Sequence, residues 1–148
     1  MTRKALGTLL GSVLAFALFA APSTRADDID QATQLTFNRA VQIPGNTMLP
    51  AGTYWFTVLN STDNHVVQIS NEDKTQVVAT LPTIDTQRAK ATNDAQVTFA
   101  EMSDTQPIAL VSWFYPDRLI GHEFAYSNQL ANRLAEGNKI TVDAQPPL

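Results

Sequence analysis

The residues best suited to chemistry in this chain are its two histidines, His65 and His122, and the glutamate that follows the second, Glu123. A catalytic zinc ion needs three nitrogen or oxygen ligands and a water molecule, which both imidazoles and a carboxylate could supply. The spacing argues against such a site, because neither H-x-H nor H-E-x-x-H occurs. In addition, neighbours in a strand point to opposite faces. We therefore expect no metal and no cofactor, and His65, His122 and Glu123 are only weak candidate ligands.

Hydrolytic chemistry is the other catalytic option for a chain that has no cysteine. A serine nucleophile on a sharp turn would be recognised as G-x-S-x-G, which is absent, and Ser112 lies inside the most apolar segment. Glycoside hydrolysis needs two facing carboxylates, for which Glu101, Asp117 and Glu123 are candidates. Fourteen acidic residues in a small protein make some proximity inevitable. We assign no catalytic residue, and a small hydrolase that uses carboxylates or His122 remains the alternative function.

Aromatic side chains indicate a binding role more strongly than these groups indicate catalysis. They gather in two segments, Tyr54–Phe56 and Trp113–Tyr115. Strand alternation places Trp55 on the opposite face of its strand from Tyr54 and Phe56, and it places Trp113 and Tyr115 on the same face of theirs. If Trp55, Trp113 and Tyr115 are exposed, their rings can stack on sugars or receive an apolar partner. The alternative is that both faces of these strands are core, with the second face covered by a helix.

Short strands separated by turn residues must position these side chains. Leu35–Phe37 and Val41–Ile43 form one bent strand or two short ones, followed by a break at Pro44–Gly45. Asn60–Asn64 has the composition of a hairpin loop, and Thr83–Asp94 is polar and is expected to be a long loop without regular structure. The remaining strands are expected at 53–59, 65–69, 75–81, 96–100, 108–115, 119–126 and 139–142.

The fold class follows from the number and order of these elements. In Ile108–Tyr115 both the odd-numbered and the even-numbered positions are largely apolar, as in a strand covered on both faces. Strand alternation places Phe114 on the same face as Leu110. Ser127 is the expected N-cap of a helix over Asn128–Glu136, which Gly137 ends. About eight short strands and one late helix, without alternation of the two, predict an all-β protein. We expect a single antiparallel β-sandwich or barrel with a C-terminal helix.

The first residues, Met1–Ala26, have the layout of a cleaved secretory signal peptide. A basic start is followed by the apolar run Leu9–Ala21 and a short polar exit. The alternative is a retained membrane anchor, although the run is shorter than the roughly 20 apolar residues of a spanning helix. Cleavage would leave one β-rich domain at 27–148, in which 27–33 and 144–148 are expected to be mobile. The expected location is the periplasm or the extracellular space.

Charge and cysteine content exclude further classes of partner and attachment. The chain has a formal net charge of −4, and loss of Met1–Ala26 would leave seven basic against fourteen acidic residues. Such a surface disfavours nucleic acids and anionic membranes. Without cysteine there is neither a disulfide nor a thiol for a lipid anchor. We expect a non-catalytic binding or structural module with an envelope protein or a carbohydrate as partner, without membrane insertion after cleavage. Association through an edge strand is a further possibility.

Two segments carry a resemblance to a group of known proteins. They are Leu49–Phe56 (LPAGTYWF) and Gly121–Tyr126 (GHEFAY), accompanied by Phe37–Ile43, Pro44–Gly45 and Trp113–Pro116. With them, most of the chain after Ala26 resembles a group of small exported β-rich proteins of acidobacteria, which share an L-P-A-G-T-Y-W-F-like and a G-x-E-F-x-Y-like segment. The resemblance implies export and a single β domain. The group has no assigned activity, so no functional residue carries over from it.

Overall fold

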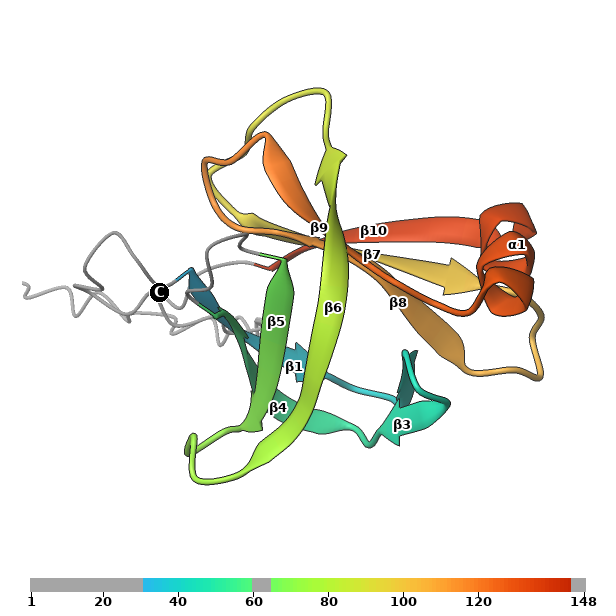
Figure 1. Ribbon diagram of the computed structural model, residues 1–148, viewed down its shortest axis with the longest axis horizontal. Helices are drawn as coiled ribbons and strands as arrows, with labels where there is room; N and C mark the ends of the chain where they lie inside the picture. The colour runs from blue at the N-terminus through green and yellow to red at the C-terminus, as the bar shows by residue number, and fades with distance from the viewer. Residues whose placement is uncertain (1–30, 60–64, 145–148) are drawn as a thin grey trace, which may run out of the picture.

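The computed structural model describes residues 31–59 and 65–144, which form ten strands and one helix (Figure 1). The predicted signal peptide at Met1–Ala26 and the predicted loop at Asn60–Asn64 lie outside the described residues. Within them, no helix has the length and hydropathy required to cross a membrane. The elements are β1 (Ala32–Phe37), β2 (Val41–Ile43), β3 (Thr47–Leu49), β4 (Gly52–Val58), β5 (Val66–Asn71), β6 (Val77–Gln87), β7 (Ala95–Glu101), β8 (Ile108–Phe114), β9 (Ile120–Phe124), α1 (Asn128–Glu136) and β10 (Asn138–Ala144).

The strands form one continuous sheet (Figure 1), which folds around a main core, and a smaller cluster of buried residues lies beside α1. Its path runs β1-β4-β5-β6-β9-β8-β2-β3, and β7 joins β8 to β10. The predicted all-β fold with one C-terminal helix is confirmed. The structure has ten strands rather than about eight, and one pair, β2 with β8, is parallel. Among the described strands, β1, β3 and β10 each pair with a single neighbour and form the ends of the sheet, and β1 and β10 are not paired with each other.

The strand β6 holds the two halves of the sheet together, and the sequence analysis predicted it only in part. Residues Val77–Pro82 pair with β5, and the following residues, to Gln87, pair with β9. Pro82 lacks an N–H group and stands where the strand changes its partner, a position at which proline is tolerated. The prediction that Thr83–Asp94 lacks regular structure is therefore wrong for its first residues. Most side chains in this half of β6 are exposed, so hydrophobic alternation is weak there.

Three further differences concern short segments. The break at Pro44–Gly45 is a tight connection in which Gly45 and Asn46 have positive φ, and it leads into β3, which the sequence analysis missed. Ala32 and Thr33 belong to β1 and pair with β4, so the expected mobile leader at 27–33 is wrong at its end. Ala144 likewise belongs to β10, where it pairs with Ala95.

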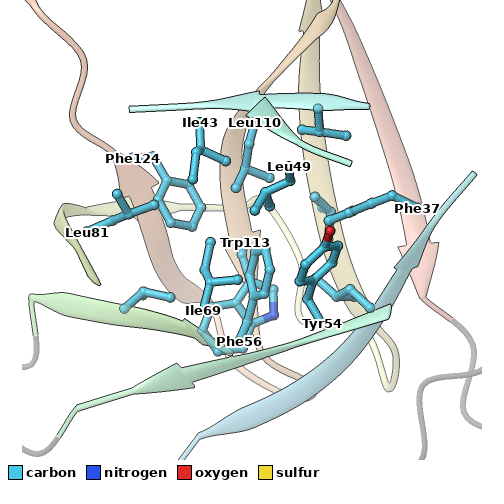
Figure 2. Close-up of a cluster of buried hydrophobic side chains, with 14 of the residues drawn as sticks. Phe37, Ile43, Leu49, Tyr54, Phe56, Ile69, Leu81, Leu110, Trp113 and Phe124 are labelled. Carbon is cyan, nitrogen blue, oxygen red and sulfur yellow. The ribbon is translucent and has the colours of Figure 1, made fainter. Parts of the chain in front are cut away.

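Aromatic rings fill the centre of the core (Figure 2). As predicted, Tyr54 and Phe56 share one face of β4 with Val58, and Trp55 lies on the other face; the first face points inward and Trp55 points outward. The ring of Phe56 packs edge-on against Trp113, with centroids 6.0 Å apart and an interplanar angle of 83°. Edge-to-face contacts of this kind add to the gain from burial. These contacts tie β4 to β8 across the core.

A β-bulge in β8 changes the side on which its last side chains lie. Thr98 pairs with Ser112 and Phe99 with Leu110, so that Val111 has no partner residue on β7. The prediction that Phe114 lies on the side of Leu110 is wrong for this reason. Instead, Leu110 and Trp113 both belong to the core, and Phe114 packs on the opposite face against Gly121.

The helix α1 has the predicted bounds, with Ser127 as N-cap and Gly137 as C-cap. The Ser127 side chain makes no capping hydrogen bond. Leu134 is the buried residue of the helix and packs against Ala100 on β7 and Ala109 on β8. Thus α1 covers one end of the second face of β8, in agreement with the expectation that a helix covers it (Figure 1).

Candidate functional site

Trp55 is a partly exposed aromatic residue on the outer face of β4. In the sheet it stands between Gln34 on β1 and Ser70 on β5. Its indole Nε1 donates a hydrogen bond of 2.9 Å to the backbone oxygen of Glu72, and the Lys74 ammonium lies 3.9 Å from the ring centroid. The indole is thus oriented from the turn that joins β5 to β6. A ring held in this way loses little conformational freedom when a ligand binds.

The turn that orients Trp55 is itself fixed by side-chain hydrogen bonds. The side-chain oxygen of Asn71 accepts from the backbone N–H of Thr75 at 2.9 Å and of Gln76 at 3.0 Å. Lys74 has a positive φ of 57°, a conformation rare for residues with a side chain. Asn71 therefore stabilises the turn that places Lys74 over the indole.

The strands around Trp55 carry hydroxyl and amide groups instead of charges. None of the three strands β1, β4 and β5 contains an aspartate, glutamate, lysine or arginine. Strand alternation places the following polar side chains on the same outer face as Trp55: Gln34, Thr36, Thr53, Thr57, Gln68 and Ser70. Among the described residues, α1 contacts β7 and β8 and lies away from β4 and β5 (Figure 1). We refer to this surface as the Trp55 face.

Trp113 and Tyr115 do not extend the Trp55 face. Trp113 is 0% exposed and lies in the core (Figure 2), so the expectation that it belongs to an exposed platform is wrong. The bulge in β8 is the physical reason, because it turns Trp113 inward. Tyr115 follows β8, is partly buried and packs against the core cluster. Of the three aromatic residues proposed from the sequence, only Trp55 presents its ring on an outer sheet face.

The two histidines lie in different segments, as expected, but β6 brings them close to one carboxylate. His65 Nδ1 lies 3.5 Å from Asp85 Oδ1, and both side chains are exposed. Asp85 also stands opposite His122 in the pairing of β6 with β9. On the same strand, the Thr83 hydroxyl lies 3.3 Å from Nδ1 of His122. Sequence reasoning missed Asp85 and Thr83, because they lie in the segment that was expected to be a loop.

His122 is in a buried environment that favours its neutral form. The residue is 7% exposed, and its ring stacks on Trp113, with centroids 5.6 Å apart and an interplanar angle of 28°. Burial lowers the pKa of His122 below its ordinary value of 6.5, the Asp85 carboxylate opposes this by raising the pKa, and His65 lowers it further. The Thr83 hydroxyl beside it is also buried, at 5% exposed. This pair is therefore shielded from any substrate in solvent.

Glu123 does not join the histidines. It pairs with Ile84 and Ser112, and alternation along β9 directs it to the face opposite His122. Over residues 31–59 and 65–144, no group of three or more histidine, cysteine, aspartate or glutamate side chains has the arrangement of a metal site. The weak metal candidates His65, His122 and Glu123 thus lack a common centre.

Arg88 is a buried cation that the sequence analysis did not single out. Its Nε donates to the backbone oxygen of Arg118 at 2.8 Å, and Nη1 donates to the Thr92 hydroxyl at 2.8 Å. Nη2 reaches the backbone oxygen of Tyr115 at 3.3 Å, and the guanidinium lies 5.2 Å from the Phe114 ring. Because it is buried and bound to loop carbonyls, Arg88 holds the connections around β8 and β9 in place. The polar sequence around Arg88 contains no motif that indicates this role.

Comparison of the chain with protein-family models, with curated proteins and with solved structures finds no match. The resemblance to exported acidobacterial proteins therefore stays a prediction.

Proposed function

We propose that this protein is an exported, non-catalytic binding module of the cell envelope or the extracellular space, and that it binds carbohydrate through the Trp55 face. The observation that supports this proposal is the fixed, partly exposed Trp55 indole on strands without charged residues. An aromatic ring stacks on the C–H groups of a sugar ring, and the surrounding hydroxyl and amide groups match its hydroxyls in hydrogen bonding. Export rests on the signal-peptide pattern of Met1–Ala26.

A panel of soluble neutral polysaccharides tests the binding proposal. Native electrophoresis through gels containing dextran, xylan, galactomannan or laminarin will show retardation by at least one of them. Trp55→Ala will abolish the retardation, because stacking is lost while the strand remains. Ile84→Ala is the matched control, since Ile84 is an exposed apolar residue on the half of β6 that pairs with β9. The proposal would be contradicted if the wild type moved in every polysaccharide gel as it does in a gel without polysaccharide. It would also be contradicted if Trp55→Ala were retarded as strongly as the wild type.

Mass spectrometry of the protein collected outside the cytoplasm tests the export component. An N-terminus at Asp27 is expected, and a chain that retains Met1–Ala26 would support the anchored alternative.

A small extracytoplasmic hydrolase is the second candidate, and one observation favours it. His65 and Asp85 lie 3.5 Å apart at an exposed position beside His122. An imidazole next to a carboxylate is the basis of general acid–base catalysis. Against it, the neighbouring Thr83 and His122 are buried. A hydrolytic activity on the same polysaccharides that Asp85→Asn abolishes would favour this candidate over the binding module.

A further inference from the structure

The strand β10 is an edge of the sheet in the part of the chain that the structure describes. It pairs with β7 only, and its residues from Asn138 to Asp143 are all exposed. An unpaired edge presents a row of backbone N–H and C=O groups that can pair with another strand. Native proteins often shorten such edges or interrupt them with a bulge, whereas β10 is a regular strand of seven residues in unbroken register with β7.

Two apolar side chains extend the core to this edge and are only partly covered. Ile140 and Val142 are each 37% exposed, and they pair with Phe99 and Val97, which are 7% and 3% exposed. The apolar row that is buried on β7 therefore continues onto β10 and ends in solvent. A further strand beside β10 would cover it.

The charges of β10 are arranged symmetrically about Thr141. Lys139 lies two residues before Thr141, and Asp143 lies two residues after it. In an antiparallel pair of β10 strands centred on Thr141, each Lys139 stands opposite Asp143 of the other copy, and each Ile140 stands opposite Val142. Opposite charges and β-branched apolar residues facing each other across antiparallel strands both stabilise the pair.

We propose that β10 pairs with β10 of a second copy of this chain, in the antiparallel register centred on Thr141. The resulting twofold symmetric dimer continues the sheet from β8 and β7 of one copy into those of the other. The charge pattern favours a second copy as the partner. When an identical strand runs in the opposite direction beside β10, its Asp143 lies opposite Lys139 and its Lys139 lies opposite Asp143. This surface is separate from the Trp55 face, so the proposal does not rest on carbohydrate binding.

The present contacts of the two charged groups differ in what they leave for a partner. The Lys139 ammonium contacts the backbone oxygens of Leu134, Ala135 and Gly137 at the end of α1. Asp143 uses Oδ1 to accept a hydrogen bond of 2.8 Å from Gln96, which leaves Oδ2 for a partner. In the dimer the ammonium exchanges one carbonyl contact for the carboxylate of the second copy.

Sedimentation velocity over a concentration series tests the dimer with charge reversals. The wild type is expected to shift from monomer to dimer as its concentration rises. Asp143→Lys and Lys139→Glu each create two like-charged pairs, and each will weaken dimerisation about tenfold. The double variant Lys139→Glu/Asp143→Lys restores opposite charges across the strands and will recover most of the lost affinity. Lys90→Glu is the control, because it reverses an exposed charge outside β10.

The outcomes separate the proposal from its alternatives. Far-UV circular dichroism of each variant confirms that α1 and the sheet are intact, which matters for Lys139 because of its contacts with the helix. A wild type that remains monomeric up to its solubility limit would overturn the proposal. A dimer that both single reversals leave unchanged would place the interface elsewhere and also overturn it. Failure of the folded double variant to recover dimerisation would refute the register centred on Thr141.

Discussion

Lowering the pH should destabilise this protein through one buried imidazole, that of His122. Burial lowers its pKa in the folded state, with an opposing effect of Asp85 and a further lowering by His65. In the unfolded chain the pKa returns to about 6.5. Above that pH both states carry the neutral ring, and its contribution to stability is fully present. As the pH falls below about 6.5, only the unfolded state binds the proton, so stability decreases until the folded pKa is reached.

The size of this effect follows from linkage. A single group that titrates in only one of the two states changes the free energy of unfolding by at most about 1.4 kcal/mol per pH unit. The stabilising contacts of the neutral ring are its stacking on Trp113 at 5.6 Å and its approach to the Thr83 hydroxyl at 3.3 Å. Protonation brings an unscreened charge into this environment, and the exposed Asp85 compensates it only in part.

Urea unfolding at several pH values tests this prediction most directly in a variant with a single histidine. The chain has two histidines, so His65→Asn leaves His122 as the only one. Between about pH 7.5 and about pH 5, above the range in which most carboxylates titrate, this variant should lose stability with decreasing pH. The double variant His65→Asn/His122→Asn should be less stable at neutral pH and nearly independent of pH in the same range. Constant stability of the single variant, or an unchanged pH dependence in the double variant, would refute the reasoning.

Tryptophan fluorescence provides an independent measurement in the folded state. The chain has two tryptophans, so Trp55→Phe leaves Trp113, which stacks on His122, as the only one. Its fluorescence should change in one step with a midpoint below pH 6.5, and His122→Asn should remove that step. A midpoint at or above pH 6.5 would show that burial does not dominate the pKa of His122.

Three further predictions concern stability, measured by urea unfolding with circular dichroism. A Cβ atom at Gly121 would overlap the Phe114 ring, so Gly121→Ala should destabilise by about 1–3 kcal/mol, and Phe114→Leu should make that substitution less costly. Tyr126→Phe should cost about 1–3 kcal/mol, because its hydroxyl donates a 2.6 Å hydrogen bond to the Leu110 carbonyl inside the fold; a cost near zero would contradict this. Arg88→Lys should destabilise by a similar amount, since an ammonium cannot reproduce the planar set of guanidinium hydrogen bonds, and a stability equal to the wild type would show those bonds to be dispensable.

Local pattern was enough to predict most elements of this fold. Alternation around Trp55 predicted correctly that Phe56 and Trp55 lie on opposite faces of the strand, but not which of the two faces is buried. The N-cap and C-cap residues predicted the bounds of α1. These features depend on neighbours in the sequence, such as the period of a strand or the preference of glycine for helix ends. They can therefore be derived without knowledge of the partners in space.

The candidate site was only partly predictable. Alternation separated Trp55 from its aromatic neighbours and left its exposure open between two alternatives. The position of Lys74 above its ring depends on the conformation of the turn between β5 and β6, which hydrophobic patterning does not give. Trp113 was assigned to the wrong environment, because the bulge at Val111 depends on the register between β7 and β8. Asp85 was overlooked, because the half of β6 that carries it has few buried residues and becomes a strand through pairing with β9.

The sequence by itself determined the class of this protein: strands of period two, one amphipathic helix, an acidic chain without cysteine and an N-terminal segment with the pattern of an export signal. Only the tertiary structure decided which side chains meet. It turned Trp113 into the core against His122, left Trp55 on the outer face, and made β10 one edge of the sheet, with its apolar residues partly exposed. The reason is that alternation is a property of one strand, whereas register, bulges and sheet edges are set by the packing of strands distant in the chain.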